Sequence, residues 1–244
     1  MYRSLRVRYV PALLPWVRFA VVDLAKWVDT AVVRRSTAHD SHRAPRREQI
    51  VVAAADAIEE FGAGVGTAQI AERAGVARPH VYRHFDSKED LAGEVLRFAA
   101  DQLIDTVRPA MQVSGTAPAI IQGVIGAALG WAAEHPNLYR FMAVRQQNKE
   151  THRARLGRTR FLGEVVAAAS AYLRTPEVEV DLPDGVLAGL MGMVDAGIIW
   201  WLDHHDESQD EVVARIARQV WLILRDLANS VGLGIDDDSY LAVR

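Results

Sequence analysis

The sequence predicts an all-α protein, and three observations favour that fold class. Apolar residues recur at intervals of three or four along most of the chain, which is the spacing of one helix face. Glycine and proline residues divide the chain into segments of helical length. No stretch of the 244 residues alternates convincingly with the period of two that a half-buried strand requires. We expect an N-terminal amphipathic helix, a small three-helix domain and a larger helical domain.

Composition and charge limit the classes of function. The chain has 50% hydrophobic residues and no cysteine. The lack of cysteine excludes a disulfide framework, thiolate metal sites and cysteine nucleophiles, and it favours a reducing, cytoplasmic setting. The net charge of −3 conceals an asymmetry, because residues 1–47 carry ten positive and three negative side chains, whereas residues 48–96 and 97–244 are each net −5. A basic arm before an acidic body indicates contact with nucleic acid or an anionic surface, or simply a solvated tail.

Residues 1–44 are expected to be an extension that precedes the first domain. Their apolar run superficially resembles a membrane anchor, but prolines at positions 11 and 15 interrupt it, and the charges of Arg18, Asp23, Lys26 and Asp29 break the span. These charges fall within one sector of a helical wheel, so an amphipathic helix is predicted over residues 15–34. A polar linker follows. The helix is expected to pack on this protein or on a partner subunit, and an interfacial membrane helix is the alternative.

Residues 45–96 are expected to form a helix-turn-helix domain. Ile50, Ala54, Ala57 and Phe61 mark the inner face of a first helix, and a glycine-rich connector follows. Two short helices are then predicted over 68–74 and 78–85, joined at Gly75, which can adopt the positive φ angle of a tight turn. The next helix starts at residue 87, where a serine can cap the free amides.

The second short helix carries the chemistry of this domain. Val81 and Phe85, four residues apart, anchor it to the core. Its outward side chains are hydrogen-bond donors and an aromatic hydroxyl with almost no negative charge, and such a surface suits a major groove lined with phosphates. The outward positions are Pro79, His80, Arg83 and His84, with Arg78 and Tyr82 at the flanks.

Residues 46–91 resemble the DNA-binding domain of the TetR (tetracycline repressor) family of transcriptional regulators. The pattern that carries the resemblance is Ile70-Ala71-x-x-Ala74-Gly75-Val76, Val81-Tyr82-x-His84-Phe85 and Ser87-Lys88-x-x-Leu91. It departs from the family in two respects. Residue 77 is an alanine where a capping serine is frequent, and the glycine-rich connector is one residue short.

The resemblance implies a role for each matching residue. Thr67, Tyr82, His84 and Lys88 would hold phosphates, Pro79 and His80 would approach base edges, and Arg78 could reach either. Arg83 would be a further DNA contact or a solvated helix residue.

Residues 97–234 are expected to form a ligand-binding and dimerisation domain, followed by an acidic tail over 235–244. Helices are predicted over 118–134, 136–146, 150–174, 184–203 and 208–231. The resemblance implies that the last two form a dimeric four-helix bundle, although such apolar stripes also occur in monomer cores. The expected interface residues are Leu190, Val194, Trp200, Ile216, Val220 and Ile223.

The small-molecule site is the least readable part of the sequence. Aromatic and apolar residues gather around a proline and would line a pocket for an apolar or amphipathic effector, or be plain core. These residues are Trp131, His135, Tyr139, Phe141 and Met142. Arginines at positions 140, 145, 153, 155, 158 and 160 leave an anionic effector open.

The sequence therefore predicts a cytoplasmic, homodimeric repressor that binds a palindromic double-stranded operator and is released by a small effector. No cofactor and no metal site is predicted, because His80 and His84 have the spacing of a metal pair but no third ligand nearby. The alternatives are a membrane-associated or structural helical protein that uses the extension, and a helical enzyme. The enzyme is disfavoured because only Asp203, His204, His205 and Asp206 resemble a site.

Overall fold

The computed structural model describes residues 43–147, 163–164, 184–230 and 232–242. The expected amphipathic helix over 15–34, the rest of the extension before residue 43 and nearly all of the expected helix over 150–174 lie outside the described residues. So do the arginines at positions 153, 155, 158 and 160.

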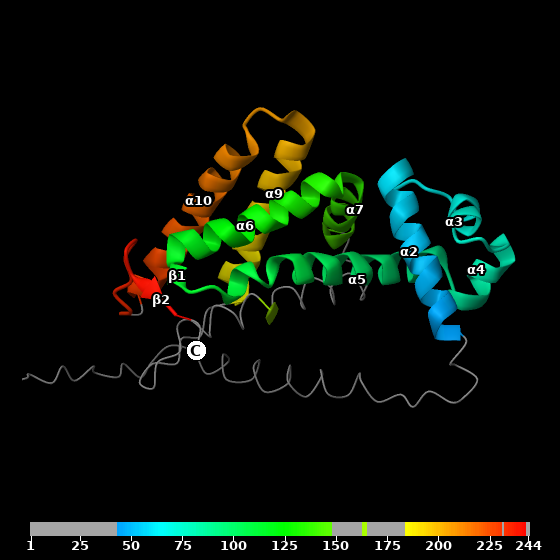
Figure 1. Ribbon diagram of the computed structural model, residues 1–244, viewed down its shortest axis with the longest axis horizontal. Helices are drawn as coiled ribbons and strands as arrows, with labels where there is room; N and C mark the ends of the chain where they lie inside the picture. Colours follow the sequence, from blue (N-terminus) through cyan, green and yellow to red (C-terminus); the bar gives the residue numbers. More distant parts are fainter. Residues whose placement is uncertain (1–42, 148–162, 165–183, 231, 243–244) are drawn as a thin grey trace, which may run out of the picture. The chain divides into compact units, whose positions relative to one another are not determined.

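The described residues are almost entirely helical, which confirms the all-α class (Figure 1). Their α-helices are α2 (Arg43–Phe61), α3 (Thr67–Arg73), α4 (Arg78–His84), α5 (Lys88–Val107), α6 (Ala117–Glu134), α7 (Pro136–Gln147), α9 (Asp184–His204) and α10 (Gln209–Ser230). A short 3-10 helix, η2 (Ala110–Gln112), follows α5. The predicted helices in these ranges begin and end within a residue or two of the observed ones, because glycine, proline and capping residues set the ends locally.

The capping predicted at the start of α5 is confirmed. The Ser87 hydroxyl accepts a hydrogen bond from the Asp90 amide at 3.0 Å, and two acidic residues lie in the first turn. Gly75 adopts a φ of +62°, which also agrees with the turn expected between α3 and α4. Both features follow from local chemistry, since a serine oxygen satisfies a free amide and a glycine has no Cβ to clash.

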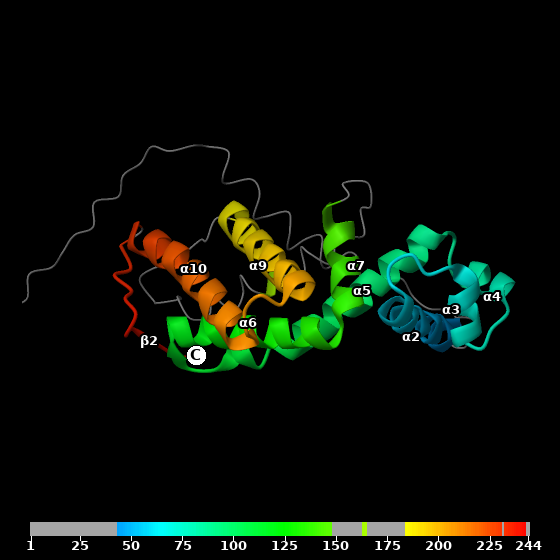
Figure 2. The same cartoon turned by 90° about the horizontal axis from the view of Figure 1, so that it is seen from above.

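A single helix, α5, joins the helix-turn-helix to the rest of the chain (Figures 1 and 2). Leu91 and Val95 in its first half belong to the same hydrophobic core as Ile50 and Phe85, and the helix packs against α6 and α7. The domain boundary expected between residues 96 and 97 therefore falls in the middle of a continuous helix. One hydrophobic core runs from α2 to α10.

The larger part of the described chain is built around α6. This helix packs on α5 on one side and on α9 and α10 on the other, which accounts for its apolar composition. By length and composition alone, α6 and residues Gly185–His204 could each span a membrane. Gly197 allows α9 and α10 to approach closely, because a Cβ there would lie 2.7 Å from Cδ1 of Ile216.

A small two-stranded pairing was not predicted. β1 (Gly115–Thr116) pairs antiparallel with β2 (Tyr240–Leu241), which brings the C-terminal tail back to the start of α6. Asp237 helps to hold the tail there, since its Oδ1 accepts a hydrogen bond from Trp221 Nε1 at 2.6 Å and from Arg225 at 3.0 Å. At least one acidic side chain of the tail is thus part of the fold.

Candidate nucleic-acid interface

The helix-turn-helix is formed by α3, the turn at Gly75 and α4. The Val76 amide donates to the Ala71 carbonyl at 2.9 Å across the turn. Val81 and Phe85 are each 1% exposed and hold one side of α4 in the core. Ala77 precedes α4 without a side-chain cap, as expected, and Pro79 lies in the first turn, where its missing amide proton costs no hydrogen bond. The opposite side of α4 therefore faces solvent.

Most of the expected DNA contacts lie on that solvent-facing side. Arg78, Pro79, His80, Tyr82, Arg83 and Lys88 are exposed, and His84 is half-buried. The three arginines from Arg73 to Arg83 are accompanied by no acid within this stretch. An arrangement of this kind presents donors and positive charge without a competing carboxylate on α4 itself, as phosphate binding requires.

Thr67 differs from the other expected contacts. It is only 9% exposed, and its Oγ1 shares a hydrogen bond with the Tyr82 hydroxyl at 3.3 Å. Its hydroxyl is thus engaged within the domain, where it fixes the end of a tyrosine that is itself 46% exposed. Hydrogen bonds with Thr67 and with Arg78 lower the pKa of Tyr82 below its usual value, and the charges of Arg78 and Lys88 act in the same direction. The tyrosine hydroxyl therefore lies in positive surroundings.

Two other arginines near this surface have structural partners. Arg73 forms an ion pair with Glu60 of α2. Arg47 donates to Glu94 Oε1 at 2.7 Å, and its guanidinium lies 4.7 Å from the centre of the Phe85 ring. Arg47 thus connects α2 to α5 next to α4, the second helix of the helix-turn-helix, which we call the recognition helix. Sequence reasoning did not single it out, because its partners lie more than 35 residues away in the chain.

The expected effector residues are mostly buried. Trp131, Tyr139, Phe141 and Met142 belong to the core, while His135 is half-buried beside Trp131, with 5.0 Å between the ring centres. The Tyr139 hydroxyl donates to Asp195 Oδ1 at 2.8 Å. Burial, followed by the charge of Asp195, raises the pKa of Tyr139 well above its usual range. Of the five residues, His135 alone lines the groove of about 430 Å³ that the described helices form between α2 and α7.

The expected dimer residues divide into two groups. Leu190, Ile216 and Val220 are buried within the chain itself, and Val194 packs against the same core. Trp200 and Ile223 are 54% and 42% exposed. The stripe on α10 is thus partly the protomer's own core, because the face that contacts α6 and the face left to solvent share one helix.

The Asp203–Asp206 segment is occupied by contacts within the fold. Asp203 forms an ion pair with Arg140 at 2.9 Å, the His204 ring stacks on Trp200, and Asp206 accepts a hydrogen bond from Trp200 Nε1. In the part of the chain that the structure describes, no three His, Asp or Glu side chains gather in a way that could hold a metal ion.

Comparison with known families identifies the small domain. Residues 50–95 match the family model of bacterial regulatory proteins of the tetR family. A tetR-family regulator from Streptomyces coelicolor superposes with a TM-score of 0.63 at 20% identity, over 76% of this chain and 83% of that one. The regulator FadR from Bacillus subtilis, solved with stearoyl-CoA, gives a TM-score of 0.58 at 18% identity, over 71% and 96% of the two chains. These similarities show a shared fold.

Curated relatives match only part of the chain. The nucleoid occlusion factor SlmA of a Marinomonas species is 28% identical over 142 residues, which are 58% of this chain and 70% of SlmA. The transcriptional activator FasR of Mycolicibacterium smegmatis is 38% identical over 73 residues, which are 30% of this chain and 33% of FasR. A matching DNA-binding domain, joined to a helical body with the same fold as solved regulators, leads to one conclusion. The helix-turn-helix is a DNA-binding domain of the tetR family of bacterial regulatory proteins, and the chain shares the fold of solved transcriptional regulators.

Proposed function

We propose that the chain is a cytoplasmic, non-enzymatic repressor that binds a palindromic operator as a homodimer and leaves it when a small effector binds. The observation that carries this proposal is the surface of α4, where donors and positive charge are exposed on a helix anchored by Val81 and Phe85. Lys88 extends this surface with a further exposed cation at the start of α5. The DNA contacts are those expected from the sequence, with Thr67 acting through Tyr82.

The outer face of α9 supports dimerisation. Between residues 185 and 200 its exposed positions are Gly185, Gly189, Ala196 and Trp200, which fall within one narrow sector of the helix and carry no charge; the exposed Asp203 and His204 follow in the last turn. An exposed face without charge over the first four turns of a helix favours burial against a second copy. Two recognition helices per particle then bind two half-sites, which raises affinity for a two-fold symmetric operator.

The buried aromatic cluster on α6 and α7 supports an apolar or amphipathic effector. Trp131 and Tyr139 lie with their ring centres 6.4 Å apart, and Asp195 supplies a polar group at the edge of the cluster. FadR, which shares the fold, was solved with stearoyl-CoA. An effector that binds one conformation of the body more tightly shifts the population away from the DNA-binding state.

Mapping of the DNA that the protein binds across its genome, followed by binding to one recovered site in vitro, tests the proposal. We expect two-fold symmetric sites, a steep loss of affinity with salt, and a further loss in the Tyr82→Ala, Lys88→Ala double variant. Absence of any site-specific binding at low salt would contradict the proposal. Repression is tested by transcription from a recovered promoter, which should rise when the gene is deleted.

A further inference from the structure

We propose that one turn of α7, residues Asn137–Arg140, sets the spacing of operator half-sites that the dimer accepts, because it fixes the helix-turn-helix relative to the dimerisation helix α9. We call these four residues the junction turn. The inference rests on the proposed dimer. The role assigned to the junction turn is to position the helix-turn-helix, and it involves no contact of these side chains with DNA.

The junction turn bonds to the helix-turn-helix through two helix ends that cap each other. The Glu59 carboxylate, near the end of α2, accepts hydrogen bonds from the Asn137 amide at 3.2 Å and the Leu138 amide at 3.0 Å. In return, Asn137 Nδ2 donates to the Glu59 carbonyl oxygen at 2.8 Å. The first amides of α7 and one of the last carbonyls of α2 are thereby satisfied by each other. A negative charge at the start of α7 is also favoured by the helix dipole.

The same turn bonds to α9 through the next two residues. The Tyr139 hydroxyl donates to Asp195, and Arg140 donates through Nε to Asp203 Oδ1 at 3.0 Å and through Nη2 to the Leu202 carbonyl oxygen at 2.9 Å. One helical turn spans only about 5.4 Å and is stiff. Hydrogen bonds on both sides of this turn therefore connect α2 to α9 and restrict the movement of one helix relative to the other.

This connection matters because the covalent link between the two parts is a single helix. α5 contributes side chains to the core of both parts, and a second contact away from its axis adds resistance to rotation about that axis. Glu59 supplies such a contact, since it lies on α2 and bonds to α7. The groove of about 430 Å³ beside it is lined by both Glu59 and Leu138, so hydrogen bonds contribute here where packing is open.

The experiment measures how affinity depends on half-site spacing. The probes are DNA duplexes carrying the site recovered with the wild-type protein from a random-sequence library, with the half-site spacing changed by one or two base pairs. One base pair rotates the second half-site by about 34° and moves it by about 3.4 Å. We expect the wild type to prefer its own spacing by about tenfold, and Glu59→Ala to reduce this preference to about twofold.

Three further proteins sharpen the test. Glu60→Ala is the matched control, because the adjacent Glu60 forms an ion pair with Arg73 inside the helix-turn-helix and should leave the preference intact. Arg140→Ala weakens the connection at its α9 side, at a partly exposed residue where folding is less at risk, and leaves the Tyr139–Asp195 hydrogen bond in place. We expect it to reduce the preference in the same direction as Glu59→Ala but by less, and the loss in the double variant to be smaller than the sum of the two single losses, because both act on one connection.

Two results would overturn the proposal. If both single variants keep the wild-type spacing profile, the junction turn does not set the spacing, while the proposed dimer stands. If the wild type itself shows no spacing preference and binds one half-site as tightly as two, the proposed dimeric function fails together with it.

Discussion

Replacing Lys88 by glutamine should flatten the salt dependence of DNA binding. Lys88 is exposed at the start of α5, next to the recognition helix, and one lysine neutralises one phosphate. A dimer then loses two phosphate contacts, so the slope of log K against log salt should become shallower by about 1.8. If wild type and variant bind equally near 1 M salt, this slope predicts a loss of about 30-fold in affinity at about 0.15 M. Fluorescence anisotropy titrations on one recovered operator over a range of salt concentrations measure both quantities.

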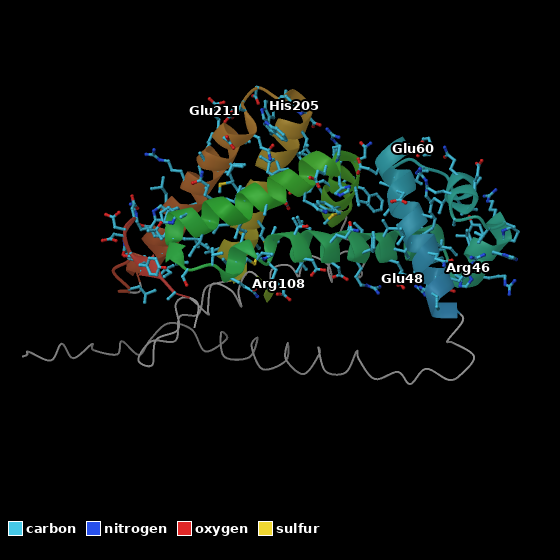
Figure 3. All side chains as sticks on the ribbon, viewed as in Figure 1. Arg46, Glu48, Glu60, Arg108, His205 and Glu211 are labelled. Carbon is cyan, nitrogen blue, oxygen red and sulfur yellow. The ribbon has the colours of Figure 1, made fainter. Side chains whose placement is uncertain are left out.

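The control for Lys88→Gln is Arg108→Gln, which removes the same charge at the other end of α5, far from the helix-turn-helix (Figure 3). Arg108 forms an ion pair with Asp105 at 2.6 Å and should leave the slope unchanged. Lys88→Arg, which keeps the charge, should also keep the slope. If Arg108→Gln flattens the slope as much as Lys88→Gln, affinity depends on the total charge of the chain and the assignment of Lys88 to a phosphate is wrong.

Three further changes test the fold and the assembly. Gly197→Ala should destabilise the protein by about 1 kcal/mol, because overpacking against Ile216 (about 1–3 kcal/mol) exceeds the gain in helix propensity. Gly126→Ala, at a glycine that faces the same helix with ordinary contact distances, should stabilise it. If urea unfolding shows that both variants change the free energy of unfolding in the same direction, the close packing at Gly197 is wrong. Gly189→Glu adds a charge to the exposed face of α9, at a position where a Cβ has open space. It should therefore convert dimers to folded monomers, as measured by analytical ultracentrifugation. If the dimer persists, the interface lies elsewhere. Because the pKa of buried Tyr139 is raised, its phenol loses the proton at a lower pH in the unfolded chain than in the folded one. The free energy of unfolding should therefore fall by up to about 1.4 kcal/mol per pH unit above about pH 10, and by less in Tyr139→Phe. Equal losses in both proteins would exclude Tyr139 as the cause.

Much of the DNA-binding domain was predictable because its determinants are local. Ser87 caps the amide three residues further on, Gly75 is needed by its own turn, and Val81 and Phe85 are neighbours on one helix face. Each of these effects acts within about one helical turn, so residue type and spacing reveal it. The same holds for the helix boundaries in the larger part of the described chain.

The local pattern was ambiguous where one helix serves two purposes. Ile216 and Ile223 both lie on α10 and both fit an apolar stripe, yet one is in the core and the other is exposed. Thr67 was expected to face DNA, and its burial depends on how Tyr82 of the following helix crosses over it. Such outcomes depend on which neighbours surround a helix, and spacing within the helix does not contain that information.

The sequence by itself thus determined the all-α class, the helix-turn-helix and the donor-rich surface of α4, since hydrophobic periodicity, capping and turn chemistry all act between near neighbours in the chain. Only the tertiary structure decided how that domain is held. Glu59 and Asn137 are 78 residues apart, and nothing in either local segment marks them as partners. They meet because α5 and α6 bring the end of α2 beside the start of α7, where each helix end leaves polar groups that the other can satisfy.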